Sequence, residues 1–121
     1  MPKKTQIRTI NKGILSKQTR VMLVPFLDGE RPEQAIKRLD AEGYIFHEVA
    51  DIARCFAEGV MLDDLYGCRA VVALGKKSRF THKGSIEVAC VYTGGDGHRR
   101  LAWAWEGFDS KHLILVSKKE L

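Results

Sequence analysis

Residues 67–117 read GCRAVVALGKKSRFTHKGSIEVACVYTGGDGHRRLAWAWEGFDSKHLILVS and contain four short segments rich in β-branched, aromatic and aliphatic side chains. Their length and composition are typical of β-strands. The four segments are Arg69–Leu74, Ser85–Tyr92, Arg99–Trp105 and His112–Val116. Two of the links, at residues 93–98 and 106–110, are short and rich in turn-forming residues. The sequence therefore predicts antiparallel neighbours that form a C-terminal β-meander.

Side-chain alternation along these segments indicates which strands are internal. The segments at residues 69–74 and 112–116 are apolar on both faces, which predicts strands covered on both sides, or covered by helices on one side and by a partner on the other. On residues 99–105, Leu101, Trp103 and Trp105 share one face. We expect both tryptophans in the core. If the helices cover the opposite face, the tryptophans become an exposed surface.

Helical patterns precede the four segments. Residues 32–42 begin with Pro32 in the first turn and end before Gly43, which predicts a helix. Residues 46–58 carry an apolar stripe at helical spacing, and residues 60–66 resemble a shorter third turn. Residues 20–26 form a strand candidate in which Pro25 either places the strand at a sheet edge or ends it at Val24. Residues 6–10 form a candidate edge strand.

These elements predict an α+β fold. Two to three helices pack on one face of a four- to five-stranded, mainly antiparallel sheet that ends in the β-meander. A length of 121 residues fits one domain. We divide the chain into a basic N-terminal arm at residues 1–19 and a single α+β domain at residues 20–121.

Charge is distributed unevenly along the chain, whose formal net charge is +5. Residues 1–20 carry six basic side chains and no acidic ones. Residues 21–66 carry four basic and ten acidic side chains, and residues 67–121 carry ten basic and five acidic ones. A basic arm and a basic sheet therefore flank an acidic helical region.

The basic segments predict binding of RNA or DNA through phosphate contacts. The segment at residues 75–84 combines cations with one aromatic ring, which could stack on a base. A second basic cluster begins the third strand, and we expect it at the opposite end of the sheet. The candidate nucleic-acid-binding residues are Lys76, Lys77, Arg79, Phe80, His82, Lys83, His98, Arg99 and Arg100, together with Lys3, Lys4 and Arg8 of the arm.

Two other functions remain open. The chain could be a protein-interaction or dimerisation module, a small inhibitor or adaptor, that uses the acidic helices or an exposed tryptophan face. It could also be a small ribonuclease in which His82 or His98 acts as general acid or base. The sequence favours a non-enzymatic protein, because no spacing of candidate residues requires catalysis.

Cysteine usage and hydropathy suggest the compartment. Cys55, Cys68 and Cys90 are odd in number and are not closely spaced, which fits a reduced, cytoplasmic setting. No His or Cys stands at a zinc-binding spacing from another, and we expect neither metal nor cofactor. The sequence has no apolar run long enough for a membrane span and no secretory signal pattern.

Overall fold

In the computed structural model, the chain is described at residues 8–9, 19–57, 68–93 and 99–119. The helices are α1 (Pro32–Ala41), α2 (Val49–Ala57) and the 3-10 helix η2 (Lys76–Ser78). The strands are β1 (Arg8–Thr9), β2 (Thr19–Pro25), β3 (Tyr44–Phe46), β4 (Ala70–Ala73), β5 (Arg79–His82), β6 (Ser85–Thr93), β7 (Arg99–Ala104) and β8 (His112–Lys119). The fold is therefore α+β, with two α-helices in the described part of the chain. The third helical turn expected at residues 60–66 lies outside these ranges.

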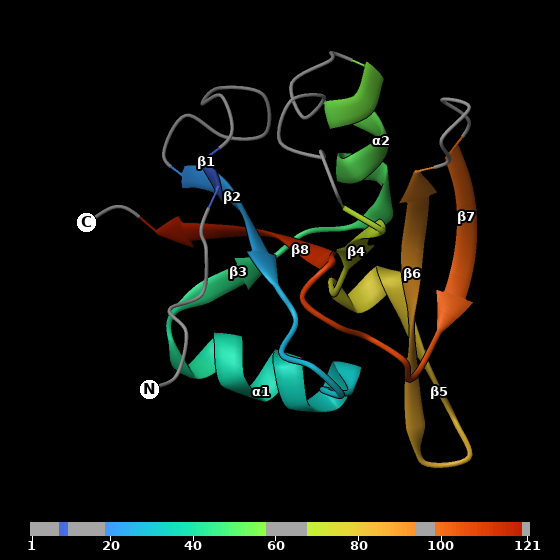
Figure 1. Cartoon of the computed structure of the whole chain (residues 1–121). Coiled ribbons are helices and arrows are strands. Elements are labelled where there is room, and N and C mark those ends of the chain that lie inside the picture. The colour runs from blue at the N-terminus through green and yellow to red at the C-terminus, as the bar shows by residue number, and fades with distance from the viewer. Residues whose placement is uncertain (1–7, 10–18, 58–67, 94–98, 120–121) are drawn as a thin grey trace.

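One sheet contains all eight described strands, in the order β1-β2-β8-β4-β6-β5. β3 pairs with the end of β8 that β4 leaves free, and β7 pairs with β6. β4 and β8 run parallel, while the other described pairs are antiparallel. The sheet is thus mixed and larger than the four or five mainly antiparallel strands that the sequence predicts. Figure 1 shows β7 at one side of the sheet and β1 at the other.

The final strand does not continue the meander. β8 lies between β2 and β4, antiparallel to β2 and parallel to β4. Leu113 and Leu115 are buried on one of its faces, and Ile114 and Val116 on the other. Such a strand needs cover on both sides, which the edge position beside β7 does not offer. The prediction of a four-strand meander was wrong in this last step, whereas the prediction of an internal β8 covered on both sides is confirmed.

The link between β7 and β8 is not a hairpin, because it leads from the edge strand β7 back to the central position of β8. Phe108 in this link is buried, and its ring stacks on Phe26 with the centroids 4.3 Å apart. The backbone N–H of Gly29 donates to the carbonyl of Phe108 at 3.0 Å. The residues at 106–110, which suggested a hairpin turn, therefore attach this link to the loop that follows β2.

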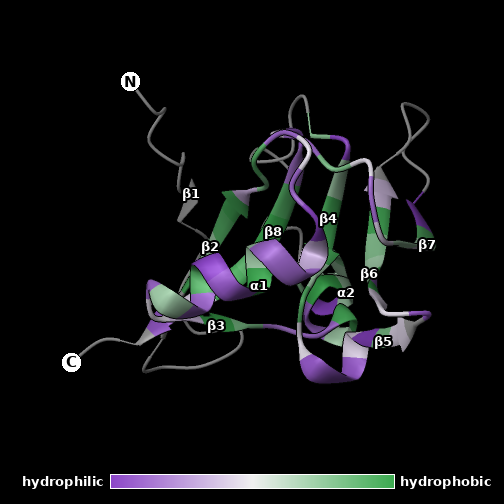
Figure 2. Ribbon diagram, turned by 90° about the horizontal axis from the view of Figure 1, so that it is seen from below, coloured by the Kyte–Doolittle hydropathy of each residue, from purple (hydrophilic) through white to green (hydrophobic). Residues whose placement is uncertain are grey.

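The two helices lie on opposite faces of the sheet. Ala35 and Leu39 of α1 pack in one cluster with Val24, Val72 and Ile114, which defines the α1 face. The other cluster, which defines the α2 face, contains Ile52, Cys55 and Phe56 of α2 with Leu23, Val71 and Leu115. The expectation that the helices cover one face was wrong, because the central strands are apolar at consecutive positions and need both layers. Figure 2 shows these strands largely in hydrophobic colours and much of α1 in hydrophilic ones.

The start of α2 also differs from the sequence pattern, which placed it near Phe46. Phe46 instead ends β3 and pairs with Val116 of β8. The helix begins at Val49. Just before it, the Glu48 backbone N–H donates a hydrogen bond to the Asp51 carboxylate at 3.0 Å. A side-chain acceptor two or three residues into a helix satisfies an otherwise free N–H group, so it fixes the boundary.

The described cysteines are not joined in disulfide bonds. Cys90 is buried under the α1 face, and burial raises the pKa of its thiol to about 12. None of the described helices is both long and apolar enough to cross a bilayer.

Candidate nucleic-acid interface

The basic segment at residues 75–84 folds into η2, β5 and a tight turn. Lys83 and Gly84 have φ values of 50° and 82°. Two consecutive positive φ values are typical of a two-residue hairpin turn. The turn joins β5 to β6 and sets the register in which Phe80 pairs with Glu87. Four of the ten residues predicted as a loop thus form a strand.

An aromatic pair, which we call the platform, lies on the α2 face of this part of the sheet. It consists of Phe80 on β5 and Trp103 on β7, whose rings stack with centroids 4.5 Å apart and planes 17° apart. The two rings meet across β6, where Ala89 pairs with Trp103 and offers only a methyl group. Phe80 is 53% exposed and Trp103 is 41% exposed. The outer side of the stack is therefore open to solvent.

The exposure of the tryptophans corrects the expectation that they belong to the core. Trp105 is also 38% exposed, and the Arg31 guanidinium lies over its ring at 5.5 Å. α2 covers Val71 and Leu115 but does not extend over β7, so the outermost strand keeps its apolar side chains on the surface. The sequence also allowed that the tryptophans are exposed if the helices cover the opposite face. The tryptophans are indeed exposed, but the helices cover both faces of the sheet.

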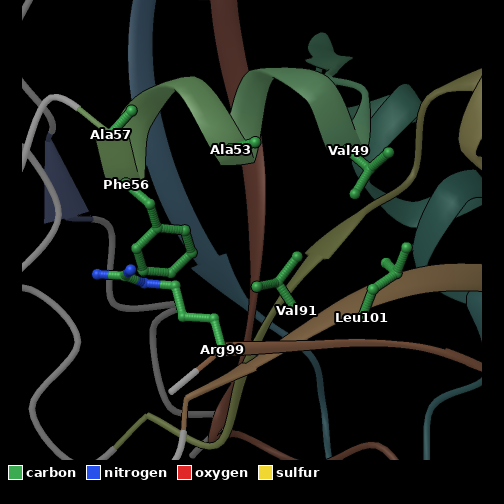
Figure 3. Close-up of a pocket in the computed structure, with 7 residues that line it drawn as sticks. All are labelled: Val49, Ala53, Phe56, Ala57, Val91, Arg99 and Leu101. Atoms are coloured by element: carbon green, nitrogen blue, oxygen red, sulfur yellow. The ribbon is translucent and has the colours of Figure 1, made fainter. Parts of the chain in front are cut away.

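A groove runs between α2 and β7 beside the platform and has a volume of about 420 Å³. Figure 3 shows its lining residues, which are Val49, Ala53, Phe56, Ala57, Val91, Arg99 and Leu101. The Arg99 guanidinium carbon lies 4.3 Å from the centroid of the Phe56 ring, a cation–π contact. Leu101 is 58% exposed. Arg99, Leu101 and Trp103 thus form a row of alternate residues along the α2 face of β7.

The structure places the candidate cations in three groups. Lys83 is exposed in the β5–β6 turn, whereas Lys76 and Lys77 are exposed in η2, just before the residue that pairs with Val88 in the middle of β6. Arg99 lies at the other end of β6, opposite Thr93. With nine residues in β6, the two ends are about 27 Å apart. Lys83 and Arg99 thus lie at opposite ends of β6, as the sequence predicts for the two basic clusters, whereas Lys76 and Lys77 lie nearer its middle.

Two further candidates face the other way. Arg79 pairs with Val88, which belongs to the α1-face cluster, so it does not share the face of Phe80. Its Nε atom is buried without a hydrogen-bond partner in the described structure. Arg100 is exposed and likewise alternates away from Arg99. Lys3, Lys4, His98 and the side chains of Arg8 and His82 lie outside the described residues.

One polar cluster was missed from the sequence. His47 Nε2 is hydrogen-bonded to Ser117 Oγ, and His47 Nδ1 lies 3.2 Å from Asp51 Oδ2. This is the order of groups in a serine-nucleophile relay. Ser117 is only 1% exposed, however, which closes its hydroxyl to a substrate. His47 and Asp51 stand four residues apart and could be noticed in sequence, whereas Ser117 lies 70 residues away on β8.

This cluster, together with Ser78, fixes the start of α2 and the segment that leads to Phe80. Ser78 Oγ donates to Glu48 Oε1 at 2.7 Å and accepts from the Val49 backbone N–H at 2.8 Å. The Gly75 N–H donates to the carbonyl of His47 at 2.9 Å. Because these hydrogen bonds occupy N–H groups at the start of α2, those groups are not available to bind an oxyanion. The cluster therefore has a structural role. The same hydrogen bonds position β5 and the platform against α2.

Gly75 provides the space for this arrangement. Its φ of −63° is ordinary, but a Cβ atom there would overlap the Glu48 carboxylate. We expect Gly75→Ala to push Glu48 away from Ser78 and to lower the free energy of unfolding by about 1–3 kcal/mol, measured by urea denaturation. In a Glu48→Ala background the same substitution should cost much less. An equal cost in both backgrounds would contradict this role of Gly75.

Among the described residues, no three His, Cys, Asp or Glu side chains gather into a metal-binding group. No family model, curated protein or solved structure matches the chain.

Proposed function

We propose that this chain binds single-stranded nucleic acid, RNA or DNA, as a cytoplasmic module without catalytic activity. The observation that carries the proposal is the half-exposed Phe80–Trp103 stack on a sheet face near exposed cations. An unpaired base can extend such a stack on its outer side, since every base offers a flat π-surface. A duplex keeps its bases stacked inside, so the platform favours single strands.

In the proposed interface, bases would contact the platform and phosphates would contact the cations around it. Lys83 lies in the turn at one end of β6, Lys76 and Lys77 lie in η2 just before β5, and Arg99 lies at the other end of β6. Glu87 pairs with Phe80 in register and places a carboxylate beside the platform. Repulsion by this carboxylate disfavours a phosphate at the platform, whereas a neutral base is tolerated. The backbone of the bound strand would then contact the cations on either side.

The main test is fluorescence anisotropy of labelled single-stranded RNA, single-stranded DNA and duplex DNA at low and near-physiological salt. We expect both single strands to bind more tightly than the duplex, with affinity that falls steeply as salt rises. Replacing Lys76 and Lys77 by alanine should weaken binding. If both lysines contact phosphates, the slope of log K against log salt should become shallower by about 1.4.

A matched control removes the same charge elsewhere. Lys37 on α1 and Lys111 before β8 are exposed, and Lys37→Ala/Lys111→Ala should leave the salt slope nearly unchanged. A Lys3→Gln/Lys4→Gln variant measures the contribution of the arm. Absence of binding to all three nucleic acids at low salt would overturn the proposed function. An equal loss in the two double variants would refute the assignment of Lys76 and Lys77.

A further inference from the structure

Among the described strands, β7 forms an edge of the sheet. Among the described residues it pairs with β6 alone, and Figure 1 shows it on the outside of the sheet. In an antiparallel edge strand, alternate residues direct their N–H and C=O groups away from the sheet. A six-residue strand such as β7 therefore presents a row of free donors and acceptors to a further strand.

The edge lacks the features that usually keep another strand away. Protective edges carry lysine or proline along the strand, or are very short. β7 has arginines only at its first two positions, and the remaining residues, 101–104, are Leu, Ala, Trp and Ala. Leu101 is the most exposed of the large hydrophobic side chains described, at 58%, and Trp103 is 41% exposed. This edge combines open backbone groups with apolar side chains.

We propose that β7 pairs with β7 of a second copy of this chain, antiparallel and centred on Ala102, to form one continuous sheet across a two-fold axis. In this register each Leu101 faces the Trp103 of the other copy, and the reverse contact follows by symmetry. Each Arg100 faces an alanine, Ala104, of the other copy, and each Arg99 lies just past the end of the other copy's β7. Apolar pairs thus meet at the centre of the interface.

Charge selects the antiparallel arrangement. Parallel pairing would place Arg99 and Arg100 against the same residues of the second copy, and directly opposed like charges destabilise a strand pair. In the antiparallel register the two Arg99 residues are six positions apart along the strand direction, which is about 20 Å. This exceeds the Debye length of about 8 Å at physiological ionic strength, so the repulsion is screened. The β7 edge is therefore complementary to itself.

The test is sedimentation velocity of the full chain over a range of concentrations, at physiological and high salt. We expect a dimer that persists at high salt, because its contacts are apolar and backbone groups rather than ion pairs. Leu101→Lys should weaken dimerisation at least about a hundredfold, since the symmetric interface loses two leucines and brings two like charges to diagonal positions about 7–8 Å apart. Leu27→Lys is the matched control, because Leu27 is also exposed but lies in the loop after β2.

Hydrogen exchange separates edge pairing from packing of the exposed faces. Amides in residues 99–104 should become more protected in the dimer than in the dilute monomer, and only edge pairing has this effect. A chain that stays monomeric at every concentration overturns the proposal. So does a dimer that survives Leu101→Lys, or one that leaves the exchange of the β7 amides unchanged.

Discussion

The Trp103→Ala variant is expected to bind single-stranded RNA about 5- to 150-fold more weakly than the parent chain, with the fold intact. The range corresponds to the loss of about 1–3 kcal/mol of base stacking. Trp103 is 41% exposed, so its removal leaves no buried cavity. Phe80→Ala should reduce affinity through the same stack. Because the two rings act together, the double variant should lose less than the product of the two single effects.

Anisotropy titrations with a labelled single strand measure these affinities, and circular dichroism checks the fold. Trp105→Ala is the matched control, since Trp105 is similarly exposed but lies under Arg31 and outside the Phe80–Trp103 stack. Its affinity should stay within about twofold of the parent. Equal losses for Trp103→Ala and Trp105→Ala would show that hydrophobicity in general, and not the platform, supports binding.

Ile114→Ala and Leu115→Ala should each lower the free energy of unfolding by about 2–5 kcal/mol. The two residues are neighbours on β8 but belong to different cores, Ile114 on the α1 face and Leu115 on the α2 face. Both side chains are fully buried, so each truncation leaves a cavity. In a sheet covered on one face only, one member of such a pair would be exposed and its truncation nearly neutral.

Urea denaturation of both variants tests this two-sided cover of β8. Leu27→Ala serves as the control, because Leu27 is exposed. This substitution should lower the free energy of unfolding by well under about 1 kcal/mol, as is usual for surface substitutions. A loss below about 1 kcal/mol for either Ile114→Ala or Leu115→Ala would be incompatible with a layer packed on that face.

Local patterns predicted the individual elements well. The strands β4, β6, β7 and β8 occur where apolar alternation and turn residues place them, and α1 follows the proline and glycine signals at its ends. These signals depend on residues within a few positions of each other, which is the range at which propensity and capping act. The start of α2 was misplaced because Phe46 pairs with Val116, 70 residues away, and the helical stripe does not show that contact.

The order of strands could not be read from the same patterns. Proximity in sequence favoured β7 as the neighbour of β8, but burial of Ile114 and Leu115 on both faces required a central position. The apolar pattern of β8 was visible in the sequence and indicated an internal strand. It did not show that β2 and β4 are the partners, since that choice depends on how the whole sheet is covered.

The candidate interface was predicted in its parts but not in its assembly. Phe80, Arg99 and the shared face of Leu101 and Trp103 were recognised from composition and alternation. Their contact depends on the hairpin turn at Lys83, which makes Phe80 part of β5, and on the limited reach of α2. Arg79 was predicted to belong to the same interface, but it lies half-buried on the other face of the sheet.

The central place of β8 affects how the chain is made on the ribosome. β2 on one side of β8, and β3 and β4 on the other, all pair with β8, and β2 and β4 have no pairing with each other in the described sheet. While residues 112–119 are still in the exit tunnel, the emerging chain can form the local β4–β6–β7 unit but cannot join it to β2. Apolar faces of both parts then stay exposed during translation, when chaperones can bind them, and the two parts close together only after β8 has emerged.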